Sequence, residues 1–167
     1  MPILEVLLLG DPLLREKSEP VTEFNDELEM IITDLKDTLQ ALQRKHGIGR
    51  ALAAPQLGYF KQVIYFKLEN RGFAMINPEI TWKSDEKTKD WDTCYSFKTA
   101  FFVKIPRHKM IEVTYFTPEG LSMKEEAEGP YAALIQHEED HLHGVLAVDL
   151  LEDSDDIIIR EEWEKIK

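Results

Sequence analysis

The sequence predicts one α+β domain in which mixed or antiparallel strands pack around a central helix. Three observations carry this prediction: apolar residues at helical spacing early in the chain, short apolar or alternating segments in its middle, and a glycine–proline pair at 129–130 that is typical of a helix start. The 167 residues can bury the core of one domain, and no repeat, low-complexity stretch or linker divides them. We therefore expect a single domain over residues 1–167.

Residues 25–45 are expected to form the first long helix. Their apolar side chains fall mostly three or four positions apart and so make one stripe, at Leu28, Ile31, Ile32, Leu35, Leu39 and Leu42. Gly47 is a suitable stop for this helix. The next segment, Gly47–Gly58 (GIGRALAAPQLG), is too irregular for a helix. We expect a loop whose small residues let the backbone approach another group closely.

Strands are expected in the middle of the chain. The segments with apolar or alternating patterns are Lys61–Lys67, Gly72–Ile76, Phe101–Val103 and Met110–Phe116. Asn77–Ile80 (NPEI) is interpreted as a turn into a further extended piece, and the polar residues 81–91 as an exposed hairpin or loop. Thr117–Gly120 (TPEG) is expected to be a turn.

A second helix is expected from Pro130 to His143, with Gly144 as its stop. Residues 132–135 (AALI) are apolar, which places this helix in the middle of the domain rather than on its surface. The tail after it is acidic from Asp149 onward and is expected to be partly helical over Ile157–Ile166.

Charge and composition exclude some classes of partner. Acidic residues outnumber basic ones 32 to 20, a net charge of -12, which argues against binding to DNA or to an anionic membrane surface. No apolar run is long enough to span a bilayer. The apolar start of the chain lacks preceding basic residues and carries Glu5 and Asp11, so it does not resemble a signal peptide. We expect a cytoplasmic protein.

The second helix carries a possible metal site. His137 and His141 lie four residues apart, so both side chains can reach one point, and Glu138 completes the pattern H-E-x-x-H. In zinc hydrolases this pattern supplies two imidazole ligands and a general base. The alternative is a chance pairing on a solvated, acidic helix end. A central helix favours the metal, because buried polar side chains need partners. His143 is offset from the pair and is expected on the surface.

Two histidines need a third ligand, because catalytic sites of this kind usually have three protein ligands and an open position. The chain has one cysteine, Cys94, whose thiolate would bind a divalent metal strongly. A lone cysteine is otherwise a small buried apolar residue. The candidate ligands are Cys94, His137 and His141, although their separation in the chain does not establish that they meet.

Three separated segments together resemble the peptide deformylase family. Residues 52–58 (LAAPQLG) match its G-x-G-L-A-A-P-Q loop, and Gln136–His141 (QHEEDH) match its Q-H-E-x-D-H helix in full. Residues 92–96 (DTCYS) stand where the family has E-G-C-L-S. The similarity continues through nearly the whole chain in the right order.

The resemblance implies the family's fold and its activity, the metal-dependent hydrolysis of the N-formyl group from the formyl-methionine of new polypeptides. It implies one divalent metal ion, usually Fe²⁺ and replaceable by Zn²⁺, Ni²⁺ or Co²⁺, held by Cys94, His137 and His141. Glu138 is expected to be the general acid and base. The side-chain amide of Gln56 and the backbone N–H of Tyr95 are expected to stabilise the oxyanion.

Departures from the family pattern fall where substrate is expected. The expected substrate-contacting residues are Gly49, Arg50, Ala51, Thr93 and Leu134. Ala51 and Thr93 each stand where the family has glycine. At Thr93 we expect either a narrower groove or a different backbone shape. Arg50 replaces an apolar residue near the methionine pocket and favours an acidic group or a carboxylate. An alternative alignment uses Gly47–Gly49 with two inserted residues, and Arg50 could also point into solvent.

Two further departures lie beside the expected metal ligands. Asp92 keeps a carboxylate behind the ligands but is one methylene shorter than the family's glutamate. Tyr95 keeps a backbone N–H but introduces a bulky phenol where the family has leucine.

The sequence is therefore compatible with three functions. The first is deformylation of an N-formylated peptide or nascent chain by a monomer, with the ribosome as a further partner. The second is the same chemistry on another N-acyl compound, selected by Arg50 and Tyr95. The third is a non-catalytic peptide-binding domain stabilised by metal. A fourth ligand such as the Tyr95 hydroxyl would indicate the third function, whereas an open position near Gln56 and Glu138 would indicate the first two.

Overall fold

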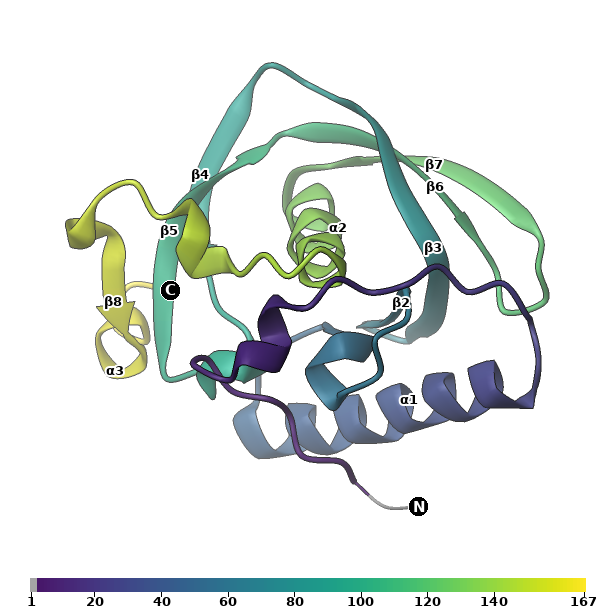
Figure 1. Cartoon of the computed structure of the whole chain (residues 1–167). Coiled ribbons are helices and arrows are strands. Elements are labelled where there is room, and N and C mark those ends of the chain that lie inside the picture. Colours follow the sequence, from purple (N-terminus) through teal and green to yellow (C-terminus); the bar gives the residue numbers. More distant parts are fainter. Residues whose placement is uncertain (1–2) are drawn as a thin grey trace.

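The computed structural model describes residues 3–167 and shows strands arranged around helix α2 (Gly129–Leu142), with helix α1 (Asp26–His46) along the outside (Figure 1). Within these residues the strands form two antiparallel sheets. The larger has the order β1-β2-β3-β6-β7 and the smaller the order β4-β5-β8. The expected α+β fold around a central helix is confirmed, and the pairing is antiparallel throughout the named strands.

The bounds of the strands are as follows: β1 Ala51–Ala53, β2 Val63–Leu68, β3 Arg71–Lys83, β4 Lys87–Asp92, β5 Phe101–His108, β6 Met110–Phe116, β7 Ser122–Glu128 and β8 Ile157–Ile159. A third, short helix, α3 (Arg160–Trp163), follows β8. No helix in the described part of the chain combines the length and the apolar character needed to cross a membrane.

Helix α1 forms as the sequence predicts. The Asn25 side chain caps its start by accepting a hydrogen bond from the Leu28 backbone N–H at 3.2 Å. Acidic residues occupy the first turn and basic residues the last, which suits the helix dipole. Gly47 ends the helix at φ 73°, a left-handed conformation that glycine adopts without strain.

Strand β2 is buried on both of its faces. Val63 and Tyr65 belong to the core that packs against α1, whereas Ile64 and Phe66 belong to the core that packs against α2. On the α2 side, that core includes Ala132, Ile135 and Leu142 of the helix itself. The amide of Gln136 clamps α2 to β5, since it donates to the His108 carbonyl at 2.8 Å and accepts from the His108 N–H at 3.0 Å.

Two loop predictions are wrong in part. Residues 47–58 are not a loop throughout, because residues 51–53 pair with β2 as strand β1 and residues 54–57 form a 3-10 turn. Asn77–Ile80 does not turn the chain: it is an irregularity inside the long strand β3. Asn77 adopts φ 52°, and its amide exchanges two hydrogen bonds with the Val21 backbone, at 2.7 and 2.9 Å. These two hydrogen bonds stabilise the irregularity, a β-bulge, within the continuous strand β3.

Residues 81–91 are not a hairpin. Strand β3 pairs with β6 as far as Lys83, and the chain then crosses to the smaller sheet, where β4 pairs with β5. Strand β5 is longer than expected and runs on to His108. Strand β7 was not predicted, because its sequence SMKEEAE is mostly charged and exposed. It forms an edge of the larger sheet by pairing with β6.

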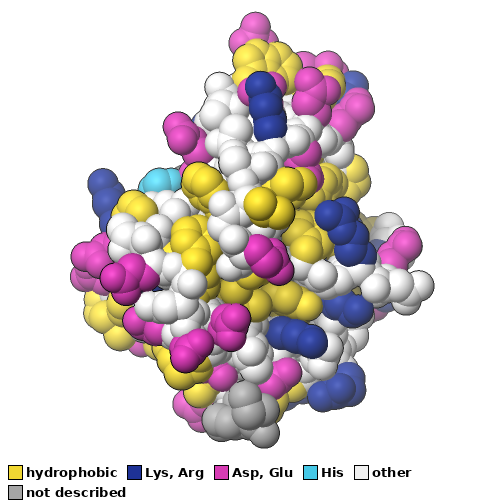
Figure 2. Space-filling model, turned by 90° about the vertical axis from the view of Figure 1, so that its right-hand side faces the viewer, with side chains coloured by type: hydrophobic (Ala, Val, Ile, Leu, Met, Phe, Trp, Pro, Cys, Tyr) yellow, Lys and Arg dark blue, Asp and Glu magenta, His cyan; other side chains and the backbone are white. Residues whose placement is uncertain are grey.

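The second helix is confirmed close to its predicted bounds, as is the turn before β7, where Gly120 has φ 85°. The tail is corrected: Ile157–Ile159 are a strand paired with β5, and only residues 160–163 are helical. Exposed apolar side chains occur near the β6–β7 turn: Phe24, Phe116, Leu121 and Met123. Figure 2 shows this side of the molecule, where hydrophobic side chains gather in the middle and charged ones surround them.

Candidate active site

The three predicted metal ligands come together in the structure. The Cys94 sulfur and one ring nitrogen each of His137 and His141 lie within 4.8 Å of one another. The two histidines project from one face of α2, and Cys94 stands just after β4, where a 3-10 turn begins. All three side chains are buried. The ligand atoms from α2 and from the end of β4 therefore meet at one point.

The arrangement fits a metal ion. The Nε2 atoms of His137 and His141 face each other at 3.3 Å. Two ligands about 2 Å from one ion at a tetrahedral angle lie roughly 3.3 Å apart, so this spacing suits a shared divalent metal. The Nδ1 atom of His141 is buried and has no hydrogen-bond partner within residues 3–167. Cysteine and histidine are ligands that iron, zinc and nickel all accept.

A chain of charges orients His137. Its Nδ1 lies 2.8 Å from Asp92 Oδ2, which also accepts from Arg107 Nη2 at 3.3 Å. Arg107 continues to Asp140, with Nη1 and the carboxylate 2.5 Å apart. Burial lowers the pKa of His137, but the Asp92 carboxylate outweighs it and holds the pKa well above the usual imidazole range. The site therefore favours positive charge beside Asp92, which is what a metal ion provides.

Arg107 was not among the predicted site residues. It is only 7% exposed, and it lies on β5 in register with the buried Val103 and Ile105. An arginine that continues an apolar alternation is the signal that could have identified it, because a buried guanidinium needs anionic partners. Asp92 and Asp140 are those partners.

Glu138 is a buried carboxyl with one oxygen free. Its Oε2 atom has no hydrogen-bond partner in the described residues. Burial raises the pKa of Glu138 to about 7, although the neighbouring charge on His137 pulls it down. A carboxyl with its pKa near neutrality can both accept and donate a proton, which suits a general acid and base.

Tyr95 directly follows the ligand Cys94, and the buried Gln56 is hydrogen-bonded to Ser96, the next residue. Gln56 is fixed by two bonds, because Oε1 accepts from the Ala53 N–H at 3.0 Å and Nε2 donates to Ser96 Oγ at 3.0 Å. The Tyr95 hydroxyl donates to the Ile48 carbonyl at 2.7 Å. This bond ties the Tyr95 side chain to the loop after α1.

The residue next to Ile48 shows how tightly Tyr95 packs. Gly49 has φ 103°, and a Cβ there would lie 2.1 Å from the Tyr95 hydroxyl oxygen. The phenol ring takes the space that a side chain at position 49 would need. This pairing of glycine and tyrosine was not visible in the sequence, because the two residues are 46 positions apart.

A cavity of about 260 Å³ opens beside the metal ligands. It is lined by all five predicted substrate-contacting residues, Gly49, Arg50, Ala51, Thr93 and Leu134, together with Cys94, His137 and Glu138. A second cavity of about 310 Å³ adjoins it and shares Arg50, Trp91, Asp92 and Leu134. Arg50 is exposed and borders both cavities.

Aromatic residues of the first cavity were missed by the sequence analysis: Trp91, Phe102 and Trp163. Trp163 comes from α3, far along the chain from the other lining residues. His143 is exposed and pairs with Glu139 at 2.7 Å, as expected for a surface residue.

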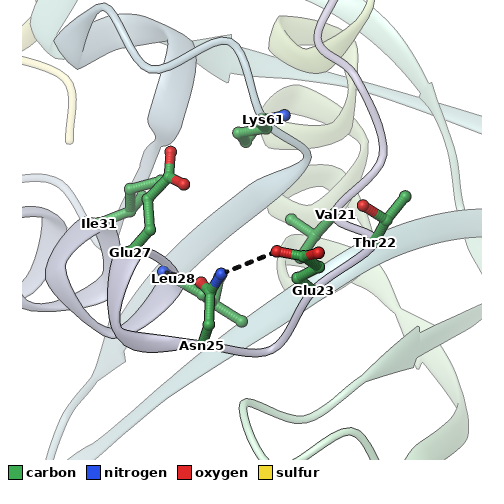
Figure 3. Close-up of a pocket in the computed structure, with 8 residues that line it drawn as sticks. All are labelled: Val21, Thr22, Glu23, Asn25, Glu27, Leu28, Ile31 and Lys61. Atoms are coloured by element: carbon green, nitrogen blue, oxygen red, sulfur yellow. Dashed lines mark hydrogen bonds between the residues drawn. The ribbon is translucent and has the colours of Figure 1, made fainter.

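A hollow of about 100 Å³ lies elsewhere, where the chain enters α1 (Figure 3). Asn25 donates to Glu23 there at 3.2 Å, and Glu27 and Lys61 border the space. None of the predicted site residues lines this hollow. Of its polar residues, Asn25 is the cap of α1, and Lys61 forms an ion pair with Glu19.

The family model described as polypeptide deformylase matches residues 3–156. The chain belongs to this family. It is 36% identical to the peptide deformylase of Thermotoga maritima over 157 residues, which cover 94% of this chain and 92% of that protein. It is 38% identical to the peptide deformylase of Heliobacterium modesticaldum over 152 residues, covering 91% and 96%.

Solved deformylase structures share the fold. The crystal structure of the Thermotoga maritima peptide deformylase superimposes with a TM-score of 0.83 at 36% identity, covering 92% of this chain and all of that one. A Synechococcus elongatus peptide deformylase in complex with actinonin gives a TM-score of 0.85 at 33% identity, covering 93% and 82%. The deformylase described here removes the N-formyl group from nascent polypeptides.

Proposed function

We propose that Cys94, His137 and His141 hold one divalent metal ion in this deformylase, with Fe²⁺ as the native metal and Zn²⁺, Ni²⁺ or Co²⁺ as replacements. The converging ligand atoms and the 3.3 Å gap between the imidazoles support the proposal. When bound, the metal supplies Lewis acidity to the formyl group and to the attacking water. Metal analysis of protein purified without oxygen tests the identity of the ion.

The observation that best supports catalysis is the buried carboxyl of Glu138, which lies beside the proposed metal ligands. One of its oxygens has no hydrogen-bond partner in the described residues. In the proposed mechanism Glu138 takes the proton of the attacking water. It then passes that proton to the amine that leaves when the C–N bond breaks. Burial favours the protonated form of this carboxyl, the form that it takes between the two transfers.

Two donors are proposed for the oxyanion. The backbone N–H of Tyr95 opens the 3-10 turn Tyr95–Phe97, so it has no acceptor within that turn. The Gln56 amide gives one of its two N–H groups to Ser96 and keeps the other for the substrate. Both groups are held before substrate arrives, which is the condition for stabilising charge that develops during the reaction.

The substrate peptide is proposed to run extended beside β1. This strand pairs with β2 on one side and forms the edge of the larger sheet among the described residues. Ala51 of this strand lines the cavity, as do Gly49 and Arg50 just before it and Thr93 from elsewhere. An extended peptide can add to such an edge through backbone hydrogen bonds. Leu134, from α2, would contact the first side chain.

A second candidate is the same hydrolysis of an N-acyl compound that carries a carboxylate. The observation that favours it is Arg50, which borders both cavities and makes no ion pair within residues 3–167. A carboxylate of the substrate would form a bidentate ion pair with this guanidinium. Comparing formyl-Met-Ala-Ser with acidic formyl peptides, in wild-type protein and Arg50→Met, separates the two candidates.

The decisive experiment measures formate release from formyl-Met-Ala-Ser by protein loaded with Fe²⁺, Ni²⁺ or Zn²⁺. Glu138→Gln should lower kcat by about 10²–10⁴-fold while it still binds one metal ion per chain. Glu139→Gln is the matched control, since Glu139 pairs with His143 and does not line the cavity. Turnover by Glu138→Gln at the wild-type rate would contradict the assignment.

We further propose that residues 1–167 act as one domain and as a monomer in the cytoplasm. Residues from both sheets, α2 and α3 of a single chain line the cavity, which supports this proposal. The ribosome is proposed as a partner through the emerging nascent chain, because a net charge of -12 offers RNA little attraction. Light scattering and co-sedimentation with ribosomes test these two points.

A further inference from the structure

The C-terminal segment lies beyond the part of the chain that the family model matches, which ends at residue 156. In the structure this segment continues as β8 and α3, drawn in yellow beside β5 in Figure 1. Strand β8 pairs with the start of β5, with Phe102 opposite Ile158. The segment is therefore attached to the strand that follows the Cys94 turn, next to the active site.

Arg160 fastens the segment to two other parts of the molecule. Its Nη1 donates to Thr99 Oγ1 at 3.0 Å, and its Nη2 donates to the His46 carbonyl at 2.6 Å. Its backbone N–H donates to the Ala100 carbonyl at 3.0 Å. The end of α1, the turn after Cys94 and α3 are thus joined by one side chain. This fixes the position of α3, which at four residues is too short to be stable alone.

Trp163 is the residue that this anchoring places at the cavity. Its ring stacks on Phe102, with centroids 4.1 Å apart and planes inclined by 14°. Lys167 Nζ also lies over the indole, 5.4 Å from the ring centroid. Trp163, Phe102 and Thr99 line the same 260 Å³ cavity as the metal ligands Cys94 and His137.

We propose that Ile157–Ile166 forms one wall of the substrate cavity, and that Trp163 with Phe102 selects peptides carrying a large apolar side chain immediately after the formylated residue. The proposal rests on the proposed function of the site. It adds a specificity determinant from a segment outside the family match. The stacked pair offers an apolar surface that a small or charged side chain would leave unused.

The position in the peptide follows from the two cavities. Successive side chains of an extended peptide point to opposite sides. Leu134 lines both cavities, whereas Trp163 lines only the one that holds the metal ligands. If the first side chain enters the adjoining cavity beside Leu134, the second side chain points away from it. We therefore assign the second residue to the wall formed by Phe102 and Trp163.

The test compares formyl-Met-Phe-Ser with formyl-Met-Ala-Ser as substrates of metal-loaded wild-type protein, Trp163→Ala and Trp163→Phe. The wild-type protein should prefer the Phe peptide in kcat/KM. Trp163→Ala should lose about 10-fold on the Phe peptide and much less on the Ala peptide, mainly through KM. Trp163→Phe should recover part of the preference, because it keeps an aromatic ring on Phe102. Equal losses on both peptides would overturn the proposal.

A matched control is Trp82→Ala. Trp82 is 52% exposed near the end of β3 and does not line the cavity, so this variant should keep the wild-type preference. A shift in preference as large as that of Trp163→Ala would show that tryptophan loss acts nonspecifically, and would overturn the proposal.

Fluorescence gives a readout that does not depend on turnover. The chain has 3 tryptophans, so Trp82→Phe/Trp91→Phe leaves Trp163 as the only one. Adding the unformylated peptide Met-Phe-Ser should shift its emission, and Met-Ala-Ser should shift it less. No response to either peptide would overturn the proposal. If the wild-type protein releases no formate from any peptide but the emission still responds, the assigned reaction fails while the peptide-binding wall stands.

Discussion

At the scale of single residues, Asp92 binds two different partners in the site at once. One oxygen serves both the ligand His137 and the buried Arg107. His137 and Arg107 hold the pKa of Asp92 below its usual range, although burial opposes this. The aspartate is therefore ionised and orients the imidazole toward the metal position. Asp92 therefore reaches both His137 and Arg107, although its side chain is one methylene shorter than the glutamate of the family pattern.

Asp92→Asn should lower metal affinity by about 10–100-fold, because the neutral amide stabilises the ligand imidazole less. The measurement is competition with a chelator of known affinity, followed by metal analysis. Asp90→Asn is the control: Asp90 lies on the same strand and is exposed, and it makes no ion pair within the described residues. Equal metal affinity in the two variants would contradict this role for Asp92.

Gly144 is held by a close backbone contact. It has φ 74°, and a Cβ there would lie 2.3 Å from the Arg15 carbonyl oxygen. Gly144→Ala should lower the free energy of unfolding by about 2–4 kcal/mol, from left-handed strain and from displaced backbone. Gly47→Ala shares the positive φ but meets no atom within 4 Å, so it should lose only about 1–2 kcal/mol. Urea unfolding of both variants checks the difference, and equal losses would rule out the contact.

The residues that sequence predicts best are those whose chemistry depends on local spacing. His137, Glu138 and His141 share one helix, so their i, i+1 and i+4 spacing already places them together. Cys94 was selected as the only cysteine, but its proximity needed the fold. Arg107 and Trp163 contribute through contacts between distant segments, which no local pattern records.

At the scale of elements, β3 depends on its bulge. The Asn77 amide satisfies both backbone groups of Val21 while the strand continues through φ 52°. Asparagine tolerates this conformation better than most residues. The bulge therefore attaches the segment before α1 to the larger sheet.

Asn77→Ala should lower the free energy of unfolding by about 2–3 kcal/mol, because the Val21 N–H and C=O lose their partners and alanine is strained at positive φ. Asn77→Gly removes the strain but not the loss of the bonds, so it should cost about 1–2 kcal/mol. Thermal and urea unfolding provide the values. A glycine variant as stable as the wild type would show that the hydrogen bonds contribute little.

The errors in element prediction have physical causes. Asn77–Pro78 has the composition of a turn, yet the bonds to Val21 keep it within a strand. Strand β7 carries its charged side chains on an exposed edge, so hydrophobic alternation is nearly absent. Ile157–Ile159 is β-branched and became a strand once β5 offered a partner. By contrast, α1 and α2 were predicted well because each has a clear start and stop.

At the scale of the whole molecule, the N-terminal segment is tied to the chain after α2. Arg15 forms an ion pair with Asp149, whose carboxylate also accepts from the Leu146 N–H at 2.9 Å. Burial would raise the pKa of Asp149, but the bonds from Arg15 and Leu146 lower it below its usual value. The ionised form is therefore the one that the fold stabilises.

A lowered pKa in the folded state gives stability that is present above the unfolded pKa, about 3.9, and is lost as pH falls through the folded pKa. Asp149→Asn should cost about 0.5–1 kcal/mol at pH 7, a modest value because both side chains are partly exposed. The difference from wild type should shrink below about pH 4. Urea unfolding at pH 7, 5 and 3.5 measures it, and a difference independent of pH would exclude the ion pair as its source.

The metal ligands join elements that otherwise belong to different parts of the fold. Cys94 follows β4 of the smaller sheet, whereas His137 and His141 belong to α2, which packs on the larger sheet. A metal ion bound to all three crosslinks the two parts in the folded state only. Ligand binding to the native state alone stabilises it by about 2.7 kcal/mol at 100 times Kd. For a chain of this size that corresponds to roughly 5–10 °C in Tm.

Removing the metal with a chelator should therefore lower the Tm of wild-type protein by about this amount, and restoring Zn²⁺ or Ni²⁺ should recover it. The same treatment should barely change Cys94→Ser, whose weakened site holds little metal to remove. Calorimetry with metal analysis on the same samples makes the comparison. A wild-type Tm that stays constant while the metal is fully removed would mean that the two sheets and α2 hold together without the crosslink. The metal would then serve the reaction alone.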